Sequence, residues 1–134
     1  MTLSQQQGTL SNFVSTWTET NTGSAGGTAT ATHSGETGKS HYLCGLIVSS
    51  KETTTASNPP TVTCNVKDGS TPGTIISFGF TAASTDDYDV SGGPQAINFT
   101  NPIMITAGQD LTVELTGASM QATSSVSFWG FTDL

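Results

Sequence analysis

The sequence predicts an all-β protein, an antiparallel β-sandwich of jelly-roll or related Greek-key topology with a polar N-terminal arm or edge segment. Segments that alternate apolar and polar side chains recur along the chain, six to eight of them at intervals of roughly ten to fifteen residues, with turn residues between them. No window places apolar residues at helical spacing, and 15 glycines disfavour long helices.

The composition fits one folded domain with a polar surface. The chain has 134 residues, enough for one hydrophobic core; 34% are hydrophobic and only 10% are charged. Its polarity comes mainly from 25 Thr and 17 Ser. Threonine is β-branched and favours strands, whereas disordered chains are rich in Glu, Lys and Pro.

The charge balance excludes two classes of partner. Ten acidic residues outweigh three lysines, no arginine occurs, and the net charge is -7. Nucleic acids and anionic membranes are bound through Lys and Arg, so we expect neither as a partner. No apolar run is long enough to span a bilayer, and the opening MTLSQQQGTLSNF lacks the basic and apolar regions of a signal peptide.

Residues 1–40 differ from the rest, and we predict them as an N-terminal arm or edge segment beside a sandwich domain of residues 41–134. Residues 18–40 contain no large apolar side chain and follow a small apolar cluster that includes Phe13 and Trp17. Two alternatives remain open. The cluster forms a first strand with the polar stretch as a loop or weak edge strand, or these residues form an arm that anchors on a neighbouring subunit through Phe13 and Trp17.

The regular pattern begins at His41. HYLCGLIVSS (41–50) is an apolar run of strand length, and TVTCNVK (61–67) alternates strictly before an Asp68-Gly69 turn signal. TIISFGFTA (74–82) places its apolar side chains Ile76, Phe78 and Phe80 on one face.

The second half continues in the same way. A short strand around Tyr88 and Val90 is one option for the acidic connection, and QAINFT (95–100) and PIMITA (102–107) are expected as two short strands interrupted at Asn101-Pro102. DLTVELTGA (110–118) then aligns its apolar side chains Leu111, Val113 and Leu115, and SVSFWGFT (125–132) places Val126 and Phe128 opposite Trp129 and Phe131.

Both cysteines are expected on the apolar side of a strand, Cys44 with Tyr42, Leu46 and Val48, and Cys64 with Val62 and Val66. Two buried thiols that behave as small hydrophobic groups are the first interpretation, and a cross-strand disulfide formed after release is the alternative. A zinc site is not expected, because no CxxC spacing is present.

The sequence offers few groups suited to catalysis or metal binding. His33 lies in the polar stretch and His41 begins a strand, and neither belongs to a GxSxG or HExxH motif. Asp86, Asp87 and Asp89 form an acidic group without the EF-hand pattern, so a solvated turn explains them better than Ca²⁺ or a glycosidase pair. We therefore predict a protein that is not an enzyme, with no catalytic residues, no cofactor and no metal.

The Asn98-Phe99-Thr100 sequon matters only in a secreted eukaryotic protein. The aromatic ending offers more. If Phe128 faces the core, Trp129 and Phe131 lie on the opposite face, where they are covered within the chain or form a contact surface. With Phe13 and Trp17 they are the candidate interface residues.

The series HYLCGLIVSS, TVTCNVKDGST, INFTNPIMITAGQDLTVELTGAS and VSFWGFT, from about Tyr42 to Thr132, is similar to small proteins encoded among the structural genes of tailed bacteriophages. The resemblance implies a head decoration (cement) protein, made in the host cytoplasm and located in the virion on the capsid surface. It implies the major capsid protein as partner and a homotrimer as oligomer, with non-covalent contacts stabilising the head. It assigns no functional residues.

A different function remains as the alternative, a carbohydrate- or receptor-binding β-sandwich of a phage tail or adhesin. Sugar sites use exposed aromatic side chains with nearby Asp and Asn, and Trp129, Phe131 and the acidic loop at Asp86–Asp89 supply both types.

Overall fold

The computed structural model describes residues 14–23, 28–52, 61–69, 73–83, 93–117 and 122–133. These ranges form strands joined by turns, and they hold no helix of the length and apolarity that a membrane span needs. The strands are β1 (Val14–Gly23), β2 (Ala29–His33), β3 (His41–Glu52), β4 (Thr61–Asp68), β5 (Thr74–Thr81), β6 (Gln95–Met104), β7 (Leu111–Thr116) and β8 (Ala122–Asp133).

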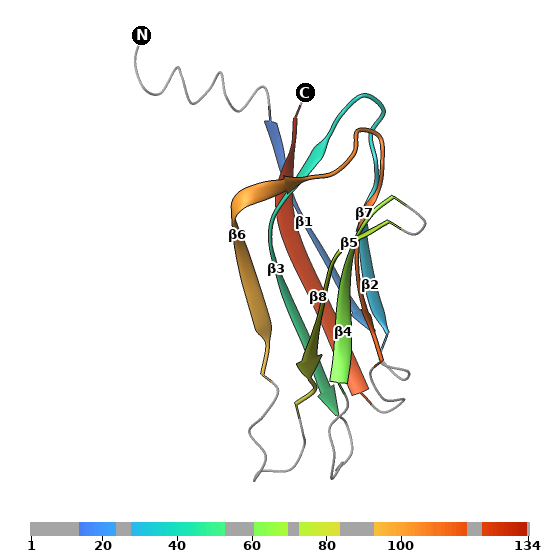
Figure 1. Cartoon of the computed structure of the whole chain (residues 1–134), viewed down its shortest axis with the longest axis vertical. Coiled ribbons are helices and arrows are strands. Elements are labelled where there is room, and N and C mark those ends of the chain that lie inside the picture. The colour runs from blue at the N-terminus through green and yellow to red at the C-terminus, as the bar shows by residue number, and fades with distance from the viewer. Residues whose placement is uncertain are drawn as a thin grey trace.

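Two antiparallel four-stranded sheets face each other along the length of the molecule (Figure 1). Their strand orders are β1-β8-β3-β6 and β2-β7-β4-β5. This arrangement is that of an eight-stranded jelly roll, in which neighbours within a sheet are distant in sequence. The predicted fold class is confirmed.

The core lies between the sheets and follows the alternation of the strands. On β4 and β7 every second side chain is fully buried, as predicted. The buried apolar side chains are Ala29, Ala31, Leu43, Leu46, Val48, Val62, Cys64, Val66, Phe80, Ala82, Ile105, Leu111, Val113, Leu115, Val126 and Phe128. On β5, Ile76 and Phe78 also point inward but stay half-buried.

A β-bulge in β3 corrects one prediction. Leu43 pairs with Gly130 and Gly45 with Trp129, so Cys44 is an extra residue without a partner on β8. The bulge reverses the alternation. Tyr42 and Cys44 point outward and are half-buried, whereas Leu46 and Val48 point inward. The four side chains that were expected on one face of the strand therefore lie on two faces. Cys64 is fully buried, and both thiols are free.

The region expected as two short strands around Asn101-Pro102 is a single strand, β6. Its pairing with β3 is nevertheless interrupted there, because Ile103 pairs with Leu43 and the next pair is Asn98 with Gly45. Figure 1 shows the ribbon bending toward the end of β6. Proline lacks the N–H of a ladder bond, and an edge strand tolerates this loss.

The first 40 residues do not stand apart from the sandwich where they are described. β1 pairs with β8 along its whole length, and β2 pairs with β7, so each is the edge strand of one sheet. The structure therefore agrees with the edge-strand alternative for residues 14–23 and 28–33. Phe13, the acidic group Asp86, Asp87 and Asp89, and the strand considered around Tyr88 and Val90 lie outside the described residues.

The alternation of β3 beyond the bulge predicts losses of stability of different size for two neighbouring substitutions. Leu46 is fully buried, whereas Ile47 is 42% exposed on the outer face. Leu46→Ala should lower the free energy of unfolding by about 2–5 kcal/mol because it leaves a cavity, and Ile47→Ala by less than about 1 kcal/mol. Chemical denaturation of both variants measures this. Equal losses would contradict the placement of Leu46 inside the sandwich and Ile47 outside it.

Candidate functional site

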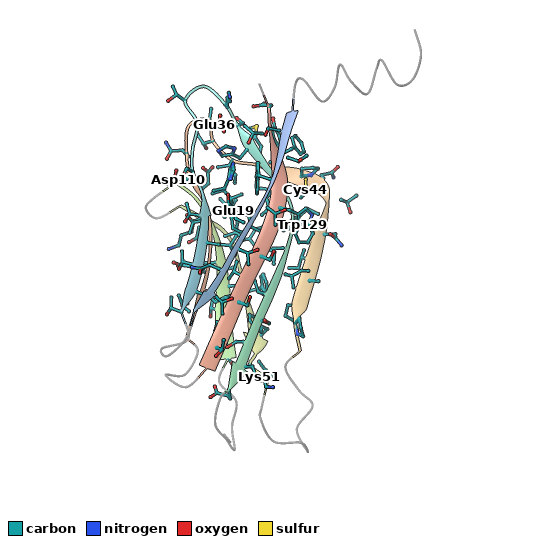
Figure 2. The ribbon with its side chains drawn as sticks, turned by 180° about the vertical axis from the view of Figure 1, so that it is seen from behind. Glu19, Glu36, Cys44, Lys51, Asp110 and Trp129 are labelled. Carbon is teal, nitrogen blue, oxygen red and sulfur yellow. The ribbon has the colours of Figure 1, made fainter. Side chains whose placement is uncertain are left out.

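The outer face of the β1-β8-β3-β6 sheet carries large apolar side chains toward one end. We call this surface the aromatic face and define it by Tyr42, Ile47, Met104, Trp129 and Phe131. Figure 2 looks onto this sheet, with Cys44 and Trp129 close together toward one end and Lys51 at the other. Met104 is 60% exposed, and it lies opposite Tyr42 in the sheet.

Trp129 lies across the neighbouring strand because its partner there is a glycine. Gly45 is the cross-strand partner of Trp129, and a Cβ atom added at Gly45 would lie 2.4 Å from Cζ2 of the indole. The ring therefore occupies the space that any other residue would fill, and it packs on the backbone of β3. This packing of an aromatic ring over a glycine fixes the ring on the sheet surface.

The second aromatic element of this face is a stacked pair. The rings of Tyr42 and Phe131, which are cross-strand partners, are 4.8 Å apart between centroids and inclined by 9°. The Tyr42 hydroxyl donates to Oδ2 of Asp133 at 3.3 Å. Loss of hydration and the Asp133 carboxylate together raise the pKa of Tyr42. The stack already fixes both rings, so little side-chain entropy is lost when a partner binds to them.

A groove of about 460 Å³ runs between β1 and these rings. Cys44 lies in it, and loss of hydration raises the pKa of its thiol. The groove is lined by Thr16, Trp17, Thr18, Cys44, Trp129, Gly130 and Phe131.

The rest of this sheet surface is polar but uncharged. Thr20 donates to Ser127 at 3.2 Å, and Thr22 lies 3.5 Å from Ser125, so hydroxyl groups continue the surface from the groove. Glu19, the acidic residue of β1, points the other way, toward His33. Among the described residues the face thus has charged side chains only near its ends, at Asp133 and Lys51.

Trp17 packs on the inner side of the same sheet. It faces Gly130, where an added Cβ would lie 2.8 Å from its ring, and it stacks on His33 with 4.1 Å between centroids. Its Nε1–H donates to Oγ1 of Thr132 at 3.0 Å. The indole belongs mainly to the packing between β1, β2 and β8, although part of it reaches the groove.

His33 and His41, which belong to no recognised motif, contact each other in this inner cluster, with 4.4 Å between their ring centroids. His41 is fully buried, and its Nε2–H donates to the carbonyl of Ser34 at 2.9 Å. Its Nδ1 lies 2.7 Å from Oγ1 of Thr132, which is within the hydrogen-bond distance between a nucleophilic hydroxyl and its general base. However, His41 and Thr132 are both buried away from solvent, and the Thr132 hydroxyl also accepts a hydrogen bond from the Trp17 indole. The geometry serves packing, and the absence of enzymatic activity stays a prediction.

The structure brings together two of the four candidate interface residues. Trp129 and Phe131 share the outer face, Trp17 lies behind them, and Phe13 is not among the described residues. Sequence reasoning missed Tyr42, Ile47 and Met104. The bulge that turns Tyr42 outward leaves no mark in the alternation. The central glycine of HYLCGLIVSS was the available signal.

The opposite sheet has a shallow polar pocket of about 390 Å³. Lys67 and Glu114 form an ion pair across it at 2.7 Å, and Asp110 accepts from the backbone N–H of Gly35 at 2.6 Å. These contacts satisfy the charges near the pocket. The described part of the chain holds no group of three or more His, Cys, Asp or Glu side chains placed to bind a metal.

No protein-family model matches the sequence, and no curated protein is similar to it. Solved structures are similar at low identity. A chain of the cyanophage Pam1 capsid asymmetric unit is 20% identical, with a TM-score of 0.46 over 91% of this chain and 86% of that one. The CBM36-1 domain of a multidomain xylanase from the hindgut metagenome of Trinervitermes trinervoides is 12% identical, with a TM-score of 0.46 over 87% and 96%. A carbohydrate-binding module CBM36, solved with calcium and xylotriose, is 18% identical, with a TM-score of 0.38 over 84% and 76%.

Gly45→Ala should displace the Trp129 indole. The added methyl group collides with the ring, so we expect a loss of about 1–3 kcal/mol in the free energy of unfolding and a shift of the Trp129 indole N–H resonance, with Trp17 little changed. NMR of the two indole signals measures this. Gly93→Ala is the matched control, since nothing lies within 4 Å of its added Cβ. An unmoved Trp129 signal would contradict the packing described.

The two thiols should differ in reactivity. Burial raises the pKa of Cys64 to about 12, so at pH 8 its thiolate is scarce and its sulfur inaccessible. Cys44 is partly exposed with a raised pKa, so it should react with iodoacetamide more slowly than a free thiol, and faster as the pH rises. Mass spectrometry should find Cys44 modified first and Cys64 only on unfolding; rapid labelling of Cys64 in the folded protein is the contrary outcome.

Proposed function

We propose that the protein is a structural protein of a tailed-phage virion, a capsid decoration (cement) protein that binds the outer surface of the head through the aromatic face. The single observation that carries the proposal is this face, which gathers exposed Ile and Met side chains and half-buried Trp, Tyr and Phe rings on a chain with a net charge of -7. Contact surfaces are enriched in such aromatic residues and in Met, and depleted of charge at their centre.

The energetics of this face suit docking onto another protein. Ile47 and Met104 are exposed by 42% and 60%, and the rings of Trp129, Tyr42 and Phe131 are half-buried and held by packing. Covering apolar side chains is favourable by about 25 cal/mol per Å² of apolar area, and little ordering is needed for rings that are already fixed. Because the centre of the face has no charged group, docking leaves no ion unpaired.

A decoration protein needs no active site, and each subunit can bind weakly because many copies act on one shell. Each bound copy stabilises the assembled head over the dissociated shell proteins by mass action. The charged side chains that the structure describes on this face lie only near its ends, and the chain's net charge of -7 keeps the free protein soluble before assembly. The capsid is proposed as the specific partner because the pattern of strands and turns resembles that of small tailed-phage structural proteins.

The N-terminal part of the proposal changes with the structure. Trp17 is a packed residue of β1, so an arm that reaches the capsid or a neighbouring subunit is confined to residues 1–13, with Phe13 as its aromatic anchor. A deletion of residues 1–20 would remove much of β1 and damage the sheet. Deletion of residues 1–13 is therefore the proper test of the arm, and undiminished binding of that variant to heads would exclude it.

A second candidate function is supported by one observation. The Trp129 indole lies over the sheet at Gly45, in the same row as Thr18 and Asn98, which pair with Trp129 and Gly45 respectively. An aromatic ring fixed between a hydroxyl and an amide suits a sugar ring, which stacks through its C–H groups and hydrogen-bonds at its rim. A carbohydrate-binding β-sandwich is therefore the alternative.

The docking face can be tested with heads that lack the protein, mixed with purified variants and sedimented. The double variant Trp129→Ala/Phe131→Ala should bind at least about tenfold more weakly, because aromatic side chains at the centre of an interface carry about 2 kcal/mol or more each. Ile75→Ala is the matched control: Ile75 is 44% exposed, but on the opposite sheet. Equal binding by the double variant and wild type would contradict the proposed face.

A glycan array separates the two candidates. Decoration predicts binding to heads and no specific sugar. Specific sugar binding that disappears in Trp129→Ala, with no binding to heads, would support the alternative instead.

A further inference from the structure

The four edges of the two sheets are protected to different degrees. At one side of the sandwich β1 and β2 close the gap between the sheets, since Asn21 Nδ2 donates to the carbonyl of Thr30 at 2.6 Å and His33 pairs with Glu19 at 2.8 Å. β2 is also only five residues long. Short, covered edges of this kind do not attract a further strand.

At the other side the edges are β6 and β5. β6 contains Pro102, which has no N–H to donate, and its pairing with β3 is irregular between Asn98 and Ile103. A strand added to β6 would meet a missing donor and a broken register. Both features are known ways in which proteins block an edge.

β5 lacks these protections. Its sequence TIISFGFT has no charged residue and no proline, and no described strand is hydrogen-bonded to its outer side. One bulge, at Ile75, lies near its start and leaves Ile76–Thr81 in regular pairing with β4. The inward side chains Ile76 and Phe78 remain half-buried, and no described strand lies beyond this edge. An uncharged, apolar edge of this length is a template for another strand.

We propose that two copies of this protein associate through β5, edge to edge and antiparallel, around a two-fold axis at Phe78. In this register Phe78 lies opposite the partner's Phe78 and Ile76 opposite the partner's Phe80, so inward side chains meet inward side chains. On the outer face Ser77 lies opposite the partner's Gly79, and both are small. The two four-stranded sheets that contain β5 then form one continuous sheet of eight strands.

The occupant is a second copy because β5 complements itself. An antiparallel pair about a two-fold axis uses the same residues twice, and in β5 this places apolar beside apolar with no unpaired charge. The acidic chain repels its own copies elsewhere, whereas β5 presents no carboxylate to an approaching β5. The result is a dimer, in contrast to the trimer that the resemblance implies.

This inference is independent of the proposed docking. β5 belongs to the β2-β7-β4-β5 sheet, and the aromatic face belongs to the other sheet, so edge pairing leaves that face exposed. The two proposals can therefore fail separately: loss of the dimer leaves head binding per subunit to be measured, and loss of head binding leaves the dimer.

Ser77→Lys tests the pairing with the full-length protein. Ser77 is exposed, and two lysines brought together across the axis repel each other, so we expect the dissociation constant of the dimer to rise about tenfold or more. Thr30→Lys is the matched control, with the same added charge on an exposed residue of the same sheet but at its other edge, β2. Sedimentation equilibrium over a concentration series measures all three proteins, and circular dichroism verifies their folding.

Hydrogen exchange gives a second measure that needs no variant. Amides of Ile76–Thr81 that point away from β4 should exchange slowly in concentrated protein and quickly on dilution. A wild type that is monomeric throughout overturns the inference, as does any oligomer, a trimer included, that Ser77→Lys leaves undiminished. Protection of β5 that appears only when heads are added would assign this edge to the shell protein and equally overturn the pairing of copies.

Discussion

Two tryptophans packed on two glycines connect the strands on which the rest of this structure depends. Trp17 of β1 packs on Gly130 of β8 from the inner side, and Trp129 of β8 packs on Gly45 of β3 from the outer side. In each pair the indole packs where a side chain on the glycine would point, although at Gly130 the carbonyl oxygen of Tyr42 lies closer still. An aromatic ring thus compensates for a residue that would otherwise weaken a strand. The contacts lie one residue apart along β8 and on opposite faces of it.

Each pair has its own consequence. The inner one joins β1 to the half-buried His33 and, through it, to the buried His41, so the polar N-terminal strands become part of the sandwich. The outer one fixes Trp129 on the surface, and the bulge at Cys44 turns Tyr42 outward to stack on Phe131. The same stretch of β8 and β3 thus stabilises the fold and builds the surface to which we assign docking.

Strict alternation made β4, β5, β7 and β8 predictable, because burial on one face selects apolar residues at every second position. The opposite placement of Phe128 and Trp129 followed from the same rule. Alternation failed where the backbone inserts a residue: the bulge at Cys44 moved Tyr42 to the outer face, and the sequence marks it only by Gly45. Strand order and the meeting of His33 with His41 depend on contacts between distant segments, which spacing along the chain does not encode.

The central claim is that the outer face of the β1-β8-β3-β6 sheet is the surface covered in the particle. Hydroxyl-radical footprinting of free and head-bound protein tests it most directly, because Tyr, Trp, Phe and Met side chains report their own solvent exposure. The account predicts that Tyr42, Met104, Trp129 and Phe131 become protected on binding while Ile75 stays reactive. Unchanged reactivity of these four residues in protein that is bound to heads would contradict it.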